Sequence, residues 1–285
     1  MRSTFSGRIW LSYLLAVIGF GLAASSQGLV AQSGPVKEGV HRPVLWYCLH
    51  YQAKGENRYA PDGAYHDVLE ILRRKFEVRV SDVEPTVGTL RGVDVILIAN
   101  PNDRAFGTNP PPAHLSGLNI GTLTRFIRRG GGLILMGNQE NHNLEMTAVN
   151  QLLGGFGMRF ETNYTDLKRF TFSITVPAEP LAQLRWAYYS GNQIQLDPKH
   201  PAHPKPWIIN NSADPILKGQ RNTAGILLAG ATLGRGRIIV VTDSGWISAN
   251  ALNGVGIGGY YIADHDNPEI IQRMVDWAAG KNGKL

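Results

Sequence analysis

The chain has 285 residues, of which 43% are hydrophobic and 18% are charged, and its formal net charge is +6. The apolar fraction suffices for a packed core and excludes a disordered chain, and the single cysteine, Cys48, excludes an intrachain disulfide. The basic residues are scattered or lie at the ends of expected helices, without interleaved aromatic residues, so nucleic acid is not an expected partner.

Residues 1–31 follow the order of a secretion signal. Arg2 and Arg8 precede an uncharged apolar run over residues 9–24, and small residues follow this run up to Ala31. The run is slightly shorter than the roughly 20 residues that a membrane span needs. We therefore expect a signal peptide and an exported protein, periplasmic or extracellular. The alternative is an uncleaved anchor over residues 9–24, which would be the only contact with a membrane.

Residues 40–280 are predicted to form one α/β domain. In its first half, strands alternate with helices: the strands are expected at 44–49, 77–80, 93–99 and 133–136, and the helices at 63–76, around 123–127 and at 144–153. Asp62 is placed to cap the first helix. The strand runs are almost wholly apolar, which is typical of a parallel sheet covered on both faces.

The second half of this domain is less regular. Residues at about 161–215 are expected to be an insertion of mixed structure: 170–177 alternate like a strand, 184–198 could form a hairpin or a loop, and 200–207 are rich in proline. Two further strands, 225–231 and 237–242, flank a turn and form a hairpin. A last helix begins at Asn267, with Pro268 in its first turn.

Polar residues follow several of the expected strands and precede the last helix. In an open parallel sheet, ligands bind at the carboxyl ends of the strands. Amide, hydroxyl, carboxylate and aromatic groups together suit a small polar ligand such as a carbohydrate, although Asn, Asp and Gly also end strands without any ligand. The candidate ligand-binding residues are His50, Asn100, Asn102, Asn138, Gln139, Glu140, His142, Asp243, Ser244, Trp246, Asn250, His265 and Asp266.

The sequence contains no complete catalytic or metal-binding motif. His50, His142 and His265 could join neighbouring carboxylates around a metal, but no pair has a recognised metal-binding spacing. Ser244 lacks the small residues two before and two after it that a nucleophile elbow requires. Cys48 lies inside an expected strand and is expected to be a buried apolar residue. We expect no cofactor, no metal and no catalytic residue.

Six segments together resemble the class I glutamine amidotransferase-like superfamily. They are VDVILIANP, LTRFIRRGGGLILMG, NQLLGGFGMRF, ADPILKG, GRGRIIVVTDSGWISAN and DNPEIIQRMVDW. More narrowly, they resemble an uncharacterised branch of exported bacterial proteins akin to accessory domains of gliding-motility and intraflagellar-transport proteins. The resemblance implies a flavodoxin-like three-layer sandwich with a mostly parallel sheet.

The resemblance also bears on activity. Catalytic members carry a cysteine at the elbow after the strand equivalent to residues 133–136, where this chain has Met136, Gly137 and Asn138. The resemblance therefore implies a non-catalytic domain that binds a small polar ligand or an envelope protein. By position, the polar strand ends of the branch match Asn138, Gln139, Asp243, Ser244 and Asn250.

A hydrolase, with carbohydrate as one possible substrate, is the alternative function. It would use Glu140, Asp243 or Asp266 together with a histidine. Such an enzyme requires two carboxylates roughly 5–10 Å apart in one cleft.

Overall fold

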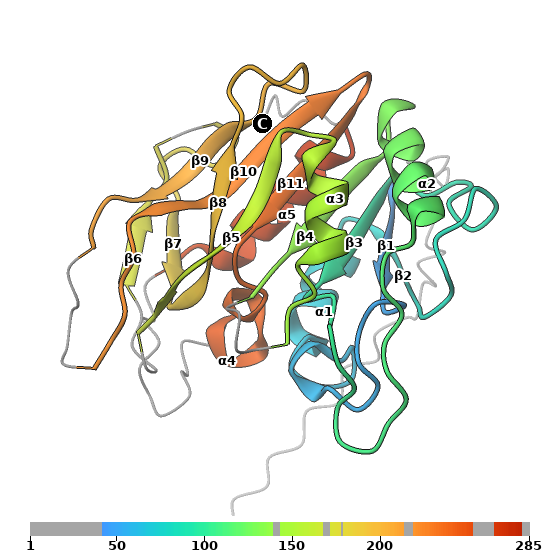
Figure 1. The fold of residues 1–285 in the computed structure, drawn as a ribbon, viewed down its shortest axis with the longest axis horizontal. Helices are drawn as coiled ribbons and strands as arrows, with labels where there is room; N and C mark the ends of the chain where they lie inside the picture. Colours follow the sequence, from blue (N-terminus) through green and yellow to red (C-terminus); the bar gives the residue numbers. More distant parts are fainter. Residues whose placement is uncertain are drawn as a thin grey trace, which may run out of the picture. The chain divides into compact units, whose positions relative to one another are not determined.

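A mixed β-sheet forms the centre of the fold in the computed structural model, which describes residues 42–138, 143–167, 172–177, 179–213, 219–252 and 265–280 (Figure 1). Its parallel strands are β1 (Val44–Cys48), β2 (Glu77–Ser81), β3 (Val95–Ala99), β4 (Gly132–Met136) and β11 (Gly236–Val241). Its antiparallel strands are β5 (Met158–Asp166), β8 (Ser190–Leu196), β9 (Lys205–Asn210) and β10 (Gly225–Leu233).

Within the described residues the strand order is β2-β1-β3-β4-β11-β10-β8-β5, and β9 pairs with β10 beside this path. The first five positions repeat the 2-1-3-4-5 order of flavodoxin-like sheets. A separate two-stranded sheet joins β6 (Phe172–Thr175) to β7 (Arg185–Tyr188). The α/β class with a mostly parallel sheet is thereby confirmed, and the antiparallel strands make the sheet mixed.

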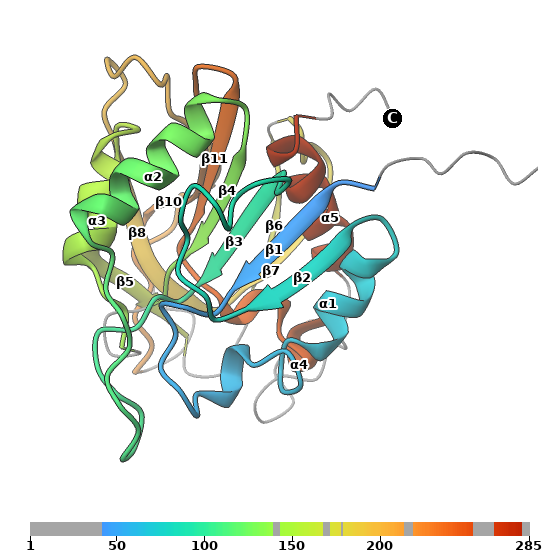
Figure 2. The same ribbon diagram turned by 90° about the vertical axis from the view of Figure 1, so that its right-hand side faces the viewer.

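Helices cover both faces of the sheet, as Figure 2 shows. They are α1 (His66–Arg73), α2 (Gly117–Arg128), α3 (Thr147–Gly154), α4 (Ala249–Leu252) and α5 (Asn267–Ala278). Short 3-10 helices are η1 (Asn57–Tyr59) and η3 (Gly245–Ile247). Alternate residues of the parallel strands pack against α1 and α5 on one face and against α2 and α3 on the other. This two-sided burial explains why the strands are apolar throughout.

Two helix starts differ from the sequence-based expectation. Asp62 does not cap α1, because Tyr65 takes the N-cap position and residues 60–65 form hydrogen-bonded turns. α2 begins at Gly117, earlier than expected, because Ser116 and Asn119 form a capping box. A sequence pattern locates the apolar face of a helix, but the cap depends on the path of the preceding loop.

The segment at about 161–215 is part of the main sheet over much of its length. Strands β5, β8 and β9 extend the sheet beyond β10, and only β6 and β7 stand apart. Residues 184–198 contain β7 and β8, which pair with different partners and do not form a hairpin with each other. Residues 1–31, the expected secretion signal, lie outside the described residues. Among those described, no helix is long and apolar enough to cross a membrane.

Candidate functional site

The carboxyl ends of the parallel strands form one polar edge. The connection after β1 runs through α1 on one face, and the connection after β3 runs through α2 on the other face. The order in which the strands are added to the sheet therefore reverses between β1 and β3. Open α/β sheets bind ligands at such a switch point.

A cavity of about 610 Å³ lies at this point, which is within the usual size range of small-molecule sites. His50, Gln52 and Asp82 line it from the ends of β1 and β2, and the loop at 111–113 contributes two prolines and an alanine. The His50 Nδ1 atom lies 3.0 Å from the carbonyl oxygen of Asp82, which fixes the ring at the cavity wall. We call this space the carboxyl-edge cavity.

A chain of hydrogen bonds connects this cavity to the next strand ends. Gln52 Nε2 donates to Tyr47 Oη at 2.8 Å and to the carbonyl oxygen of Ala99 at 3.0 Å. Tyr47 Oη donates to the carbonyl oxygen of Tyr59 at 2.5 Å, and Asn138 Nδ2 donates to Tyr59 Oη. Groups from β1, β3, η1 and the turn after β4 are therefore held in one buried network.

Asp243 lies at the end of β11 and is fully buried. Its Oδ1 atom accepts a hydrogen bond from the backbone N–H of Gly245 at 2.7 Å, whereas Oδ2 is buried without a hydrogen-bond partner among the described residues. Burial raises the pKa of Asp243 to about 7, although backbone N–H groups and the charge of Arg58 act in the opposite direction. A buried carboxyl group with such a pKa is a common mark of a functional site.

Aromatic hydroxyl groups surround this carboxyl group. Burial raises the pKa values of Tyr59, Tyr65 and Tyr188, and the charge of Asp243 adds to the increase. Burial and Asp243 also raise the pKa of the half-buried Tyr189 to about 12. These tyrosines consequently remain neutral at physiological pH and can act as hydrogen-bond donors.

Ser244 ties two strand ends together. Its hydroxyl group donates to the carbonyl oxygen of Gly137 at 2.7 Å, and its own carbonyl oxygen accepts a hydrogen bond from Tyr65 Oη at 2.6 Å. The hydroxyl proton is thus used for a backbone contact between β11 and β4. No hydrogen bond joins Ser244 to His265 within the described residues.

His265 and Asp266 act at the start of α5. His265 Nε2 donates to the carbonyl oxygen of Ala251 at 2.8 Å, and Nδ1 accepts from the Asn267 N–H at 3.2 Å. Burial lowers the pKa of His265, in agreement with this neutral form. The Asp266 carboxylate accepts a hydrogen bond from the Arg185 N–H at 2.7 Å. These two candidate residues connect α4, α5 and β7.

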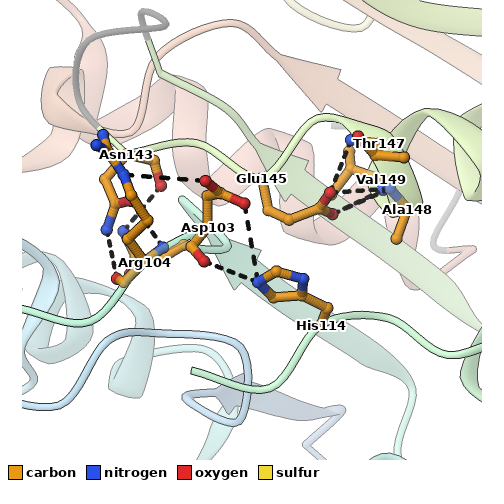
Figure 3. A network of polar contacts seen from close by, with 9 residues as sticks. Asp103, Arg104, His114, Asn143, Glu145, Thr147, Ala148 and Val149 are labelled. Carbon is orange, nitrogen blue, oxygen red and sulfur yellow. Dashed lines mark hydrogen bonds and ion pairs between the residues drawn. The ribbon is translucent and has the colours of Figure 1, made fainter. Parts of the chain in front are cut away.

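Asn102 positions the loops around the edge. Its Oδ1 atom accepts from the Ala53 N–H at 2.7 Å, and its Nδ2 atom donates to the carbonyl oxygen of Asn143 at 3.3 Å. Three further hydrogen bonds, of 2.7, 2.8 and 3.4 Å, join Asn143 and Arg104 (Figure 3). Asn100 has a φ of +40°, a left-handed conformation that asparagine tolerates better than most residues.

The remaining candidates have different places. Trp246 is fully buried and packs edge-on against Trp186, with ring centroids 5.8 Å apart, so it belongs to the core. Asn250 lies in α4. Gln139, Glu140 and His142 lie outside the described residues. Where the structure describes the chain, no group of three His, Cys, Asp or Glu side chains is placed to bind a metal.

Sequence reasoning missed several groups at this edge. Gln52, Glu56 and Arg58 all follow β1, in a segment that the sequence marked only as a polar loop. Arg58 Nε donates to Glu56 Oε1 at 2.8 Å, and the guanidinium group lies 5.7 Å from the Tyr59 ring centroid. Their polar character was visible in the sequence, but the burial of Gln52 and Glu56 and the contacts of Glu56 with the exposed Arg58 depend on the fold.

This geometry defines the class of protein as an α/β fold with a mostly parallel, mixed sheet. No protein-family model matches the chain. The N-terminal domain of mmIFT52 aligns with a TM-score of 0.62 and 14% identity, over 85% of this chain and 99% of that one. A ThuA-like protein from Bacteroides uniformis aligns with a TM-score of 0.51 and 10% identity, over 86% of this chain and 95% of that one.

Two further similarities complete the comparison. The cytoplasmic protein STM1381 from Salmonella typhimurium aligns with a TM-score of 0.50 and 11% identity, over 83% of this chain and 99% of that one. TRPM8 channel-associated factor 2 from Mus musculus is 25% identical over 185 residues, which is 59% of this chain but only 20% of that protein. The structural similarities show the fold, and they include an intraflagellar-transport domain and a ThuA-like protein. They do not by themselves establish the superfamily.

Proposed function

We propose that this chain is a non-catalytic, glutamine amidotransferase-like binding domain with a three-layer sandwich fold, and that it holds a small polar ligand such as a carbohydrate in the carboxyl-edge cavity. The observation that carries the proposal is the position of this cavity, at the switch point between β1 and β3. The two helical layers against the sheet support the sandwich.

The chemistry of the cavity suits a sugar. The polar residues His50, Gln52, Glu56 and Asp82 line the space, and the prolines at its wall offer apolar surface to C–H groups. The neighbouring backbone is fixed, because Gln52 is bound to β1 and β3. A preformed set of polar groups reduces the entropic cost of binding.

The absence of a nucleophile at the elbow supports a non-catalytic role. Gly137 and Asn138 occupy the turn after β4, and the hydroxyl group of Ser244 is bound to Gly137. Both ring nitrogens of His265 hold backbone groups. An envelope protein is the other partner that the sequence analysis left open.

The proposal is tested by titrating the full chain with a panel of neutral mono- and disaccharides in a calorimeter. We expect at least one sugar to bind, and we expect Ala113→Phe, which fills the cavity, to weaken that binding at least ~10-fold, about 1.4 kcal/mol. His50→Ala, which removes a lining side chain, should also weaken the binding, and His66→Ala is its matched control, because His66 is exposed on α1 and does not line the cavity. Absence of sugar binding, or unchanged binding by the Ala113→Phe variant, contradicts the proposal.

A hydrolase is the second candidate, and Asp243 is the observation that favours it. A carboxyl group with a pKa near 7 can donate a proton to a leaving group. The same titration mixtures, analysed by chromatography, separate the two functions. Cleavage of a sugar by the wild-type chain and its loss in Asp243→Asn would identify a hydrolase.

Location is part of the proposed function. The basic, apolar and small segments within residues 1–31 support export of the domain to the periplasm or the medium. An anchor over residues 9–24 would instead hold the same domain at a membrane.

A further inference from the structure

A second cavity, of about 520 Å³, lies at the opposite edge of the sheet from the carboxyl-edge cavity. Val93 and Asp94, which precede β3, and Gly130 and Gly131, which precede β4, line it together with the last turn of α2. Its volume falls within the range of small-molecule sites, roughly 300–1,000 Å³. We call this space the arginine cavity.

Three arginines contribute to the arginine cavity: Arg91, Arg125 and Arg129. All three are exposed, and no ion pair joins any of them to a carboxylate within the described residues. Asp94 is the acidic lining residue, and its Oδ2 atom accepts a hydrogen bond from the Val44 N–H at 2.7 Å. The cavity therefore has an excess of positive charge.

The side chains of Arg125 and Arg129 are not needed to cap the C-terminal carbonyl groups of α2. The carbonyl groups of Phe126 and Ile127 accept backbone N–H bonds of 3.1 Å from Gly131 and 2.9 Å from Gly130. Arg128 is the last residue of α2, and Arg129 is its C-cap. The carbonyl groups of both residues accept hydrogen bonds from Arg235. Arg125 Nη2 donates to Thr122 Oγ1 at 3.4 Å, which holds the side chain at the cavity wall. Because other donors satisfy the carbonyl groups, the remaining N–H groups of Arg125 and the side chain of Arg129 are available to a ligand.

The lining also has an apolar part, formed by Leu90, Val93 and Phe126, with Val87 60% exposed beside them. Gly131 permits this arrangement, because a Cβ atom there would lie 2.3 Å from the ring of Phe126. An inorganic anion alone would leave this surface in contact with water. An anion that carries an apolar group would cover it.

We propose that the arginine cavity binds a small anion with an apolar body, such as an aromatic phosphate or carboxylate. The guanidinium groups hold the anionic group through charge-assisted hydrogen bonds, which are stronger than neutral ones. Phe126 and Val87 pack against the apolar body. This site lies apart from the carboxyl-edge cavity, so it does not depend on the proposed sugar binding.

The test uses the full chain, with phenyl phosphate and inorganic phosphate as probes in separate calorimetric titrations at low salt. We expect phenyl phosphate to bind at least ~5-fold more tightly than inorganic phosphate, since burying its ring adds about 1 kcal/mol or more. Arg125→Gln and Arg129→Gln should each weaken phenyl phosphate binding ~10-fold, and Val87→Glu should weaken it by repulsion.

Arg128→Gln is the matched control, because Arg128 is also exposed in the last turn of α2 but does not line the cavity. Its binding constant should equal that of the wild-type chain, and circular dichroism checks that every variant is folded. Equal affinity for both probes would overturn the apolar part of the proposal. An equal loss in Arg128→Gln and Arg125→Gln would overturn the site, because the effect would then come from net charge.

Discussion

Asp243 combines complete burial with an Oδ2 atom that has no hydrogen-bond partner among the described residues. The sequence marked this residue as polar and as following a strand. It could not show that Tyr59, Tyr65 and Tyr188 would surround the carboxyl group, because these residues come from two distant segments. The raised pKa is therefore a property of the folded chain.

The pH dependence of stability should report this pKa. The pKa of Asp243 is about 7 in the folded chain, against 3.8 for an ordinary aspartate. Between these values the folded state retains a proton that the unfolded state has lost, so stability falls as the pH rises through this window. Each pKa unit corresponds to about 1.4 kcal/mol, which makes the total loss a few kcal/mol.

Asp243→Asn removes this titration and keeps an oxygen for the Gly245 N–H. Urea unfolding should show the variant to be a few kcal/mol more stable than the wild-type chain at pH 8, and the difference should shrink towards pH 4. An identical pH dependence in both chains would show that Asp243 titrates normally.

Helix α2 shows how local chemistry sets the start of an element. Ser116 Oγ accepts a hydrogen bond from the Asn119 N–H at 3.1 Å, and the Ser116 N–H donates to Asn119 Oδ1 at 3.0 Å. Asn119 Nδ2 also donates to Glu84 Oε1 at 2.7 Å, which holds the start of the helix to the loop after β2. The apolar spacing of α2 was visible in the sequence, the Ser116–Asn119 capping box is local, and only the contact with Glu84 depends on the tertiary structure.

Ser116→Ala should lower the free energy of unfolding by about 1 kcal/mol. The Asn119 N–H loses its acceptor, Ser116 Oγ, and the Asn119 side chain that accepts from the backbone N–H of residue 116 loses its bond to the Ser116 hydroxyl group. Chemical denaturation measures this difference. Thr108→Ala is a suitable control, since Thr108 is exposed in the loop before α2, and its stability should stay within about 0.5 kcal/mol of the wild-type chain. Equal stability of Ser116→Ala and the wild-type chain would show that the cap contributes nothing.

At the scale of the whole molecule, one sheet combines two kinds of sequence. The parallel strands β1, β3 and β4 are buried at every residue, because helices cover both faces. Strand β5 has buried and exposed positions, and its pairing with β8 shifts register between Phe160 and Tyr164. The continuous apolar runs predict the parallel strands directly, whereas β5, β8 and β9 lie within the segment that the sequence marks as an insertion of mixed structure.

Export concerns the whole chain and can be measured directly. Expression of the complete sequence in a Gram-negative host, followed by cell fractionation, should place the protein in the periplasm or the medium. Mass spectrometry should find it shortened by about 24 to 31 residues, because signal peptidases cut after small residues. Full-length protein in the membrane fraction would favour the anchor, and full-length protein in the cytosol would contradict both alternatives.

By itself, the sequence determined the α/β class, most of the parallel strands and the last helix. These depend on the local spacing of apolar residues, which any helix or strand must satisfy to bury one or both faces. Only the tertiary structure decided the strand order, the membership of β5, β8 and β9 in the main sheet, and the surroundings of Asp243. It also brought Arg91 to Arg125 and Arg129 around one cavity. Contacts between residues far apart in the chain depend on how the elements pack, and no short stretch of sequence contains that information.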